Sequence, residues 1–356
     1  MELIRRMVAD EWRRLTTASF FLLALLFHAQ GIAAQDFIFR ISDTGTSSNF
    51  RGLSAVNDSV VWISGTDGTV CRSIDGGNQF DCMVVPGCDT LDFRSVYAFS
   101  DSSVIIANAG TPAKIFRTDD AGKSWSVVYE NDHKDAFING IDFWNEKEGV
   151  CYGDPMMGLM LMLKTQDGGW SWRLMHPESR PLLVDNEFSF AASGTGIRCY
   201  DTERLMISTG GEISRLLYSD NQGITWRQML PPIIQGKNST GIFSFAFRDT
   251  MNGVIVGGDY LIDTLSTQNA FYTVDGGLSW TAPETTPRGY RECVTYLNND
   301  TLFTCGPTGI DISTDGGASW KGFSDEKGFH VMRKARSGSL LLLAGKRGRV
   351  GVISIH

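Results

Sequence analysis

The feature that most constrains the fold of this chain is a short motif that occurs six times. It reads Ser/Thr-x-Asp-x-Gly-x-Ser/Thr-aromatic in most copies, with Asn in place of Asp in the fourth. The copies occupy residues 73–80, 118–125, 165–172, 219–226, 273–280 and 313–320. Their closing aromatic residues recur every 40 to 54 residues or so, and a period of about that length is typical of propellers and solenoids.

Each copy is predicted to form the turn of a β-hairpin. An Asp or Asn side chain folds back onto the backbone N–H groups that follow it, and Gly supplies the positive φ of a tight turn. Apolar runs flank the second copy at 114–117 and 126–129. Two further apolar runs, 94–99 and 103–107, precede them. Together these give four strands per unit, which is the pattern of a propeller blade.

The composition also favours an all-β fold. The 356 residues include 39 Gly against 10 Pro, and 21 Phe, 9 Trp and 9 Tyr, which describes a chain rich in turns and aromatic side chains. The net charge of −8 argues against a general affinity for nucleic acid or for an anionic membrane. A local basic pocket is compatible with that charge.

The repeats predict seven blades. Three apolar runs follow the sixth motif, without a fourth strand after them. We expect residues 37–41 to supply that strand, so that the N-terminal segment closes the last blade. Residues 35–356 then form a single propeller domain of about 46 residues per blade. The alternative is a six-bladed ring with an additional tail.

Residues 1–34 have the three parts of a secretory signal peptide. Four arginines precede a short apolar run at 20–27, and small residues end the segment near Ala34. The run is too short for a membrane-spanning helix of about 20 residues. We therefore expect a monomeric protein that is secreted or periplasmic, with no membrane association beyond the signal peptide. An uncleaved N-terminal anchor is the alternative.

Seven cysteines follow the signal peptide, and none forms a C-x-x-C pair. A zinc ribbon or a thioredoxin-type motif is therefore not expected. A hairpin turning near residue 299 would place Cys293 opposite Cys305, and Cys71 and Cys82 flank another turn. Either pair can form a disulfide in an oxidising compartment, and the alternative is buried free thiols.

The repeated motif resembles the Asp-box, also called the BNR repeat, of sialidases, sortilin-type receptors and photosystem II assembly factors. Short sequence segments within the blades, such as Phe50-Arg-Gly52 and Arg288-Gly-Tyr-Arg291, are similar to those of exported bacterial BNR-repeat propellers. Members of that group are often described as oxidoreductases or glycosyl hydrolases. The resemblance implies a propeller, but these families have unrelated functions, so it implies no single activity.

Phe39-Arg-Ile-Ser42 resembles a sialidase arginine element in which Ser replaces Pro. Because Arg40 falls on an outer strand, we do not expect sialidase activity.

The candidate site lies at the mouth of the central channel. With the strands of a blade named A to D from the inside outwards, the Asp-box turns join C to D on one face. The A-strand starts and the B–C loops share the other face, where binding residues are expected. Alignment of the A strands gives these starting residues: Arg51, Arg94, Asn139, Thr195, Ile242, Arg291 and His330. With Tyr260 from a B–C loop, the arginines, Asn139 and His330 predict a mouth that binds carboxylate, sulfate or phosphate groups. The alternative is structural pairing with nearby acids, the candidates being Asp92, Asp154, Glu187, Asp259 and Glu292.

Three carboxylates on this face are candidates for general acid–base catalysis: Asp154, Glu187 and Asp259. A pair about 5 Å apart, or wider with a water between, would suit glycoside hydrolysis. The segment 181–196 before the fourth A strand is longer than the usual connection, and we expect it to cover part of the channel.

Other chemistries have no support in the sequence. Gly122-Lys-Ser124 resembles the end of a phosphate-binding loop, but Arg117 stands where the first Gly belongs. There is no Rossmann fingerprint, no H-E-x-x-H and no nucleophile elbow, so we expect no cofactor and no metal.

Two functions remain open. The first is an exported propeller that binds an anionic small molecule or acidic glycan at the channel mouth, with or without hydrolysing it. The second is a non-catalytic scaffold or assembly factor that binds a protein partner, similar to photosystem II assembly factors. If the chain is an enzyme, the resemblance indicates a glycoside hydrolase.

Overall fold

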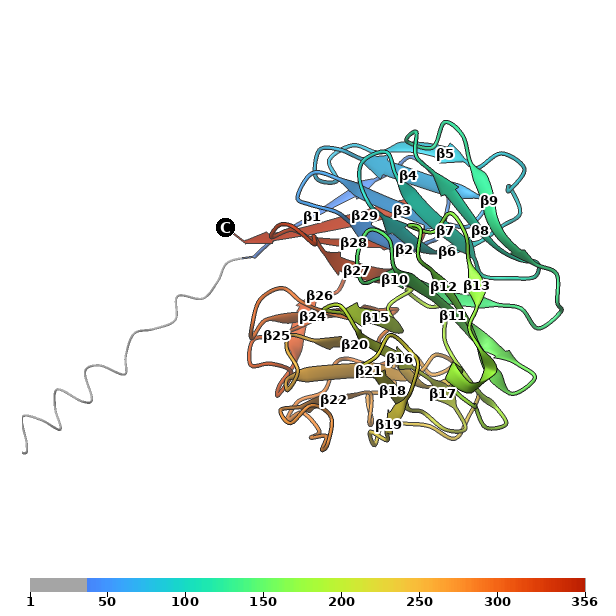
Figure 1. Cartoon of the computed structure of the whole chain (residues 1–356). Coiled ribbons are helices and arrows are strands. Elements are labelled where there is room, and N and C mark those ends of the chain that lie inside the picture. The colour runs from blue at the N-terminus through green and yellow to red at the C-terminus, as the bar shows by residue number, and fades with distance from the viewer. Residues whose placement is uncertain (1–36, 356) are drawn as a thin grey trace, which may run out of the picture. The chain divides into compact units, whose positions relative to one another are not determined.

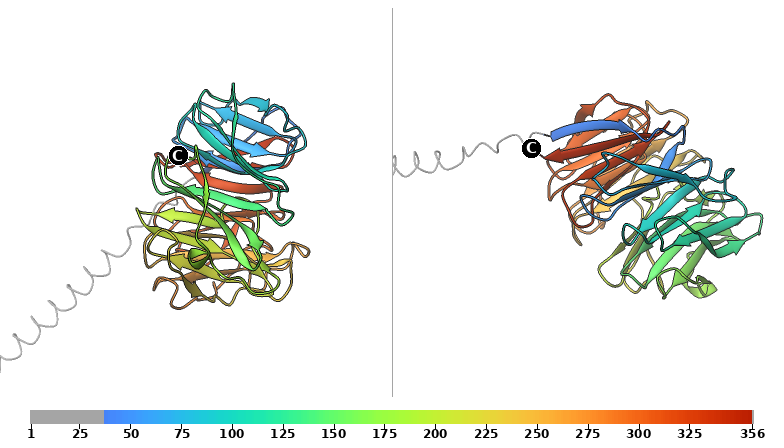
Figure 2. Two further views of the ribbon diagram at one scale, coloured as in Figure 1. Left: turned by 45° about the vertical axis from the view of Figure 1, so that its right-hand side comes forward. Right: turned by 90° about the horizontal axis from the view of Figure 1, so that it is seen from above.

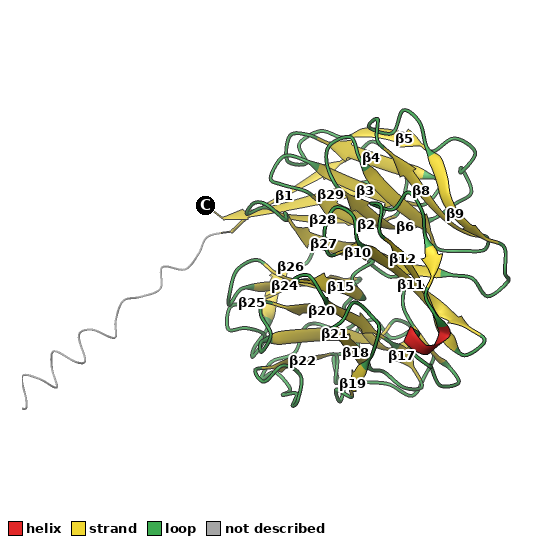
Figure 3. Ribbon diagram, in the orientation of Figure 1, coloured by secondary structure: helices red, strands yellow, loops and turns green. Residues whose placement is uncertain are grey.

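The structure is a computed structural model that describes residues 37–355. The predicted signal peptide, residues 1–34, lies outside them. One compact unit spans Ile38–Ser354 and consists almost entirely of strands and loops, as Figure 3 shows. Its one helical element is the short 3₁₀ helix η1 (Pro177–Ser179). Among the described residues, no helix has the length and apolar character needed to cross a bilayer.

Seven antiparallel sheets follow one another along the described chain, and each is one blade. Blades one to three consist of β2 (Phe50–Ala55), β3 (Val61–Gly65), β4 (Thr69–Ser73) and β5 (Asp81–Val84); β6 (Phe93–Ala98), β7 (Val104–Asn108), β8 (Ala113–Thr118) and β9 (Ser126–Asn131); and β10 (Ile138–Phe143), β11 (Gly149–Met156), β12 (Leu159–Thr165) and β13 (Arg173–Leu174). Blades four to six consist of β15 (Ile197–Tyr200), β16 (Arg204–Ser208), β18 (Leu216–Ser219) and β19 (Arg227–Met229); β20 (Thr240–Phe247), β21 (Gly253–Asp259) and β22 (Ala270–Thr273); and β23 (Cys293–Tyr296), β24 (Leu302–Gly306), β25 (Gly309–Ser313) and β26 (Lys321–Ser324).

The seventh blade confirms the predicted closure. It has the order β27 (Phe329–Lys334), β28 (Leu341–Gly345), β29 (Arg349–Ile355) and β1 (Phe37–Asp43), so the N-terminal strand is its outermost member. Figures 1 and 2 show β1, in blue, beside the red β29. The blades neighbour one another in a closed cycle that returns from β27 to β2, mostly through their inner strands; between blades four and five the contact is made by β16 and β20. The chain is therefore an all-β, seven-bladed propeller, and the six-bladed alternative is wrong.

Blade five departs from the common plan. Its outer strand is reduced to a single bridge between Tyr272 and Thr281. On its inner side, β14 (Glu187–Phe188) and β17 (Gly210–Gly211) extend the sheet, because β17 pairs with both β14 and β20. The long segment before blade four is thus attached to blade five across the predicted site face.

The six Asp-boxes form the expected turns between the C and D strands. In the third box, Thr165 Oγ1 donates to Asp167 Oδ1 (2.8 Å) and accepts from the Gly169 N–H (2.8 Å). The carboxylate of Asp167 also accepts from the backbone N–H and the hydroxyl of Ser171 (2.9 and 2.6 Å). In the fourth box Asn221 makes equivalent bonds, with its Nδ2 donating to Thr225 Oγ1 (2.8 Å). The boxes are therefore structural turns, held by bonds within each motif.

The cysteines divide between the two predicted states. Cys71 and Cys82 form a disulfide between β4 and β5. Cys293 and Cys305 lie directly opposite each other on β23 and β24, as predicted, but both are buried free thiols.

Candidate functional site

The A-strand starts surround a recess of about 400 Å³ at the mouth of the channel. We call it the mouth recess, and it is lined by Arg51, Arg94, Phe190, Ala191, Ala192, Phe243, Tyr260, Tyr290, Glu292 and Pro307. Three predicted ligand-binding residues are therefore brought together here: Arg51, Arg94 and Tyr260. The other three, Asn139, Arg291 and His330, are all buried.

The strand registers define which A-strand residues are equivalent. In five blades one residue near the start of strand A has no partner on strand B. These unpaired residues are Arg51, Arg94, Asn139, Phe243 and His330. Such a β-bulge turns one extra side chain out of the regular ladder. By register, the corresponding residues of the other blades are Thr195 and Glu292. We call these seven residues the mouth layer.

Two of the seven predicted starting positions are wrong by one residue. The structure has Phe243 where we expected Ile242, and Glu292 where we expected Arg291. Because successive side chains on a strand point to opposite sides, a shift of one residue moves the side chain away from the channel. Ile242 accordingly packs in the hydrophobic core between blades. The fully buried guanidinium of Arg291 instead pairs with Asp311.

A buried network joins three members of the mouth layer. Glu292 Oε2 accepts from Arg51 Nη1 (2.9 Å) and lies 2.7 Å from His330 Nδ1. Burial opposes ionisation of Glu292, but the charges of Arg51 and His330 outweigh it and hold the pKa of this carboxyl below its ordinary value. Arg51 Nη1 also donates to the carbonyl of Ala192 (2.7 Å). Glu292 therefore neutralises Arg51, as the structural-pairing alternative expected.

Arg94 is held in the same manner. Its Nε donates to Asp92 Oδ2 (2.7 Å), and its Nη1 donates to the carbonyl of Ala191 (3.5 Å). The side chains of Arg51 and Arg94 remain 23% and 34% exposed. One edge of each guanidinium is thus occupied, while part of each side chain still reaches the solvent of the recess.

Aromatic rings form part of the wall of the mouth recess. Phe190 and Phe243 are stacked at 3.7 Å between centroids, and Tyr260 contacts both rings edge-on at 6.4 and 6.3 Å. Tyr290 packs edge-on against Phe243 at 4.6 Å. Such a wall offers apolar area and π faces to a ligand that also carries negative charge. These aromatic residues, other than Tyr260, were not predicted.

The segment before blade four crosses the channel. The carbonyls of Ala191 and Ala192 accept from Arg94 and Arg51, and the carbonyl of Gly194 accepts from Arg333 Nη2 (2.7 Å). Residues 191–194 therefore contact blades one, two and seven. The prediction that this segment covers part of the channel is confirmed. We call residues 181–196 the plug.

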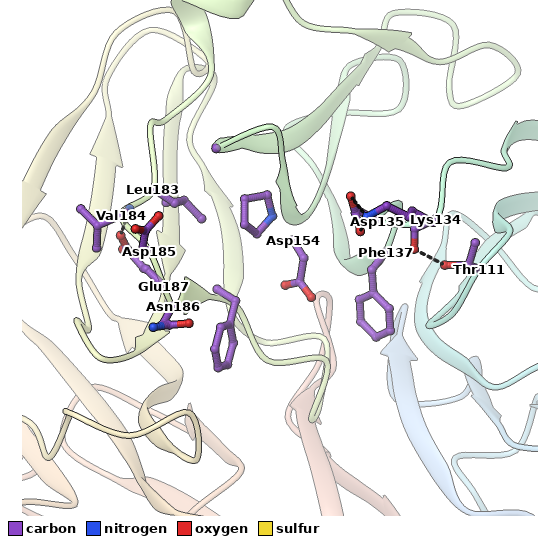
Figure 4. Close-up of a pocket in the computed structure, with 13 residues that line it drawn as sticks. Thr111, Lys134, Asp135, Phe137, Asp154, Leu183, Val184, Asp185, Asn186 and Glu187 are labelled. Carbon is purple, nitrogen blue, oxygen red and sulfur yellow. Dashed lines mark hydrogen bonds and ion pairs between the residues drawn. The ribbon is translucent and has the colours of Figure 1, made fainter.

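A second cavity of about 510 Å³ lies beside the plug on the same face (Figure 4). It is lined by two of the predicted carboxylates, Asp154 and Glu187. Asp154 Oδ1 accepts from Asn139 Nδ2 (2.8 Å) and from the Ser189 N–H (3.3 Å). Burial raises the pKa of Asp154, against the lowering effect of these two hydrogen bonds. Asn139 is thus a buried partner of Asp154.

Glu187 is the most strongly engaged of the three carboxylates. Arg215 donates hydrogen bonds to both of its oxygens, from Nε to Oε1 (2.7 Å) and from Nη2 to Oε2 (2.6 Å). Thr209 Oγ1 and the Val184 N–H supply two further hydrogen bonds. This fork-to-fork pair anchors the start of the plug segment to blade four.

Asp259 has a supporting position in a different blade. It is buried, its Oδ1 accepts from the Leu261 N–H (3.0 Å), and its Oδ2 lies 3.6 Å from Lys237 Nζ. It thereby shapes the loop that carries Tyr260. Among residues 37–355, no three His, Cys, Asp or Glu side chains gather closely enough to hold a metal ion.

The motif and the architecture define the class of this protein. A family model described as the BNR/Asp-box repeat matches residues 217–228, which include the fourth box. The chain is a BNR/Asp-box repeat β-propeller. No curated protein sequence matches it.

Solved structures share the fold. "YCF48 bound to D1 peptide" superposes with a TM-score of 0.64 at 12% identity, covering 88% of this chain and 96% of that one. YCF48 from Cyanidioschyzon merolae gives 0.63 at 15% identity, with 89% and 98% covered. The WD40 propeller domain of Doa1 gives 0.60 at 14% identity, with 90% and 97% covered. At these identities the likeness is one of fold.

Proposed function

We propose that this propeller is a non-catalytic docking module that holds a peptide segment of a partner protein in the mouth recess. One observation carries this proposal: an exposed apolar loop stands at the edge of the aromatic recess. Tyr260, Leu261 and Ile262 all expose large apolar side chains there, and that of Leu261 is 74% exposed. An exposed apolar group beside a recess with aromatic and arginine walls is the composition of a protein-binding surface.

The chemistry of the recess indicates which peptide segment fits. Its wall of Phe190, Phe243 and Tyr260 accepts an apolar or aromatic side chain. Arg51 and Arg94, which also line the recess, favour a carboxylate, from an acidic residue or from the C-terminus of the peptide. The expected ligand is therefore a short segment that combines an apolar anchor with negative charge. The YCF48 structure with a bound D1 peptide supports a peptide as ligand for this fold.

The environment of the three candidate catalytic carboxylates also favours docking over hydrolysis. Glu187 has both oxygens occupied by Arg215, and Asp259 supports a loop from a buried position. General acid–base catalysis needs a carboxyl free to exchange a proton with substrate. Asp154 is the one of the three whose raised pKa suits an acid, and it has no role in the docking proposal.

Selection from a displayed library of random 12-residue peptides tests this proposal, since the partner is unidentified. We expect enriched peptides that pair an apolar or aromatic residue with acidic residues or a free C-terminus. Their affinity should fall at least about tenfold in Tyr260→Ala and in Leu261→Glu, because these changes remove the apolar edge of the recess.

Leu278→Glu is the matched control. Leu278 is 90% exposed in the fifth Asp-box, on the face opposite the mouth recess, so its replacement adds the same charge away from the site. Affinity should be unchanged in this variant. The docking proposal fails if no peptide is enriched, or if the Leu261 and Leu278 variants lose affinity equally.

A second candidate function is recognition of an anionic small molecule or acidic glycan at the same recess, with hydrolysis by Asp154, Glu187 or Asp259 as its catalytic extension. The partial exposure of the Arg51 and Arg94 side chains favours it. A thermal-shift series with glucuronate, sialic acid and sulfated disaccharides tests it. Stabilisation that is lost in Arg94→Ala would support this function, and an unchanged melting temperature with every ligand would exclude it.

We also propose that the protein acts outside the cytoplasm, secreted or in a periplasm. The basic and apolar pattern of residues 1–34 and the Cys71–Cys82 disulfide support this location. Fusion to a reporter that is active only after export tests it, and reporter activity that does not depend on residues 1–34 would contradict it.

A further inference from the structure

The opposite end of the channel carries a second ring of equivalent residues. Three positions after the mouth layer, the registers of the seven A strands place one residue from each blade at the same level. We call this ring the box-face layer: Ser54, Tyr97, Asp142, Arg198, Ala246, Thr295 and Arg333. It lies towards the ends of the A strands, on the face that carries the Asp-box turns.

A cavity of about 210 Å³ opens within this layer. Its charged lining residues are Asp142, Arg198, Arg333, Lys334 and Arg336, so four cations face one carboxylate. The carboxylate is already engaged with the backbone. Asp142 Oδ1 accepts from the Phe143 N–H (3.0 Å), and Oδ2 accepts from the Cys199 N–H of the next blade (2.8 Å). The cavity is therefore strongly positive in a protein whose net charge is negative.

The three arginines of the cavity differ in how many of their guanidinium N–H donors have a hydrogen-bond acceptor. Arg336 donates to Ser54 Oγ (3.0 Å) and to the Ala98 carbonyl, and it stacks on the ring of Tyr97 at 4.6 Å. Arg333 uses Nη2 to bind the Gly194 carbonyl of the plug, but its Nη1 is buried and meets no acceptor among residues 37–355. The side chain of Arg198 makes no hydrogen bond or ion pair within the described chain.

Unpaired guanidinium groups in a partly closed cavity are energetically costly. Burial, followed by the charge of nearby Arg198, lowers the pKa of Arg333 to about 9. A structural ion pair would have removed this cost, and none of the acids described in the chain pairs with Arg198 or Arg333. Arg198 and Arg333 line the same small cavity, so an anion there would lie beside two guanidinium groups that no carboxylate pairs with.

We propose that the box-face cavity binds a small oxyanion with two negative charges, such as phosphate, sulfate or a short dicarboxylate. The guanidinium groups of Arg198 and Arg333 would hold its oxygens through charge-assisted hydrogen bonds, for which planar forks are suited. The cavity has room for on the order of seven water molecules at about 30 Å³ each, which fits a small anion rather than a drug-sized ligand. This site is separate from the mouth recess and does not depend on the docking proposal.

Isothermal titration of the full chain with sodium phosphate, sulfate and succinate tests the proposal, with sodium chloride at matched ionic strength as the reference. We expect saturable binding of at least one dianion and none of chloride. Arg198→Gln should weaken binding at least about tenfold, because it removes a charged donor. The side chain of Arg198 makes no bond within the described chain, so this variant is expected to fold normally.

Arg227→Gln is the matched control, since Arg227 lies on the outer strand β19 and is paired with Asp220. It should leave the affinity unchanged, as should Tyr260→Ala at the mouth recess. Arg333→Met gives a second measure of the same loss. The proposal is overturned if no dianion binds, or if the Arg198 and Arg227 variants weaken binding equally.

Discussion

The two ends of the channel contain similar numbers of arginines, but those arginines have different partners. At the mouth layer, Arg51 is paired with Glu292, and Arg94 with Asp92. At the box-face layer, Arg198 has no partner within the described chain, and Arg333 has one unsatisfied nitrogen. The mouth end, which the sequence predicts to be basic, is therefore largely neutralised, while the box-face end keeps its charge.

This difference shows that a count of arginines does not identify an anion site. A guanidinium that already has a carboxylate and a carbonyl stabilises the fold, whereas one without acceptors costs stability unless a ligand supplies them.

The largest effect is expected at Glu292, the buried centre of the mouth network. Glu292→Ala leaves Arg51 without its carboxylate and His330 without its buried partner, and should lower the free energy of unfolding by about 3–5 kcal/mol. Urea unfolding measures the loss. A loss below about 1 kcal/mol would show that the mouth arginines are not held by this pair.

Arg51→Ala should have a smaller effect than Glu292→Ala. Glu292 keeps His330 as a partner, and the plug loses one hydrogen bond at Ala192, so we expect a loss of roughly 1.5–3 kcal/mol. Arg40→Ala is the control, because Arg40 is exposed on the outermost strand β1 and should change the stability by less than about 0.5 kcal/mol. Equal effects of the two changes would contradict the network.

Acid should lower the stability that ionised Glu292 contributes, by less than Arg51→Ala lowers it. The pKa of Glu292 is depressed in the folded state, so its ionised form contributes stability above the unfolded value, near 4.5. That contribution is lost as the pH falls through the lowered folded pKa. The stability difference between the wild type and Glu292→Gln should therefore shrink below about pH 4.5. Thermal melts of both proteins from pH 7 to pH 3 measure it, and a constant difference over that range would refute it.

The smallest effect is expected at the other end of the channel. Arg198→Ala removes an unpaired cation close to Arg333, so the stability without added anion should stay within about 0.5 kcal/mol of the wild type or increase. Urea unfolding in a chloride buffer measures it. A loss above about 1 kcal/mol would show that Arg198 has a structural partner.

The sequence was sufficient to predict the blades and their closure. The Asp-box combines a hydroxyl, a carboxylate and glycine at fixed spacing, and all of its bonds are local, as the contacts of Thr165 and Asp167 show. Local chemistry of this kind can be read from one sequence. The closing role of β1 followed from a count of strands and not from a motif.

The register of the A strands could not be predicted to the residue. Residues 240–247 form an almost entirely buried strand, so its apolar pattern does not mark which side faces the channel. The bulge at Phe243 is set by backbone pairing with β21, which the sequence does not display. A similar shift moved Glu292 into the place expected for Arg291, and this changed the predicted charge of the mouth.

The box-face arginines had a sequence signal that was not used. Arg198 and Arg333 each interrupt the apolar pattern of an A strand three positions after its mouth-layer residue. They lie on the face of the Asp-box turns, whereas propeller sites are expected at the A-strand starts and the B–C loops of the other face. The aromatic wall of Phe190 and Phe243 had no such signal, because phenylalanine is common throughout this chain.

The pairing of β1 with β29 has a consequence for how the protein folds. Six blades are built from strands that are near one another in the sequence, and each can form early from local contacts. The seventh needs the first and last strands of the described chain, so its loop-closure entropy is the greatest in the molecule. Ring closure is therefore expected to be the last and slowest folding step, and until it occurs the outer edge of β29 stays unpaired and open to other chains.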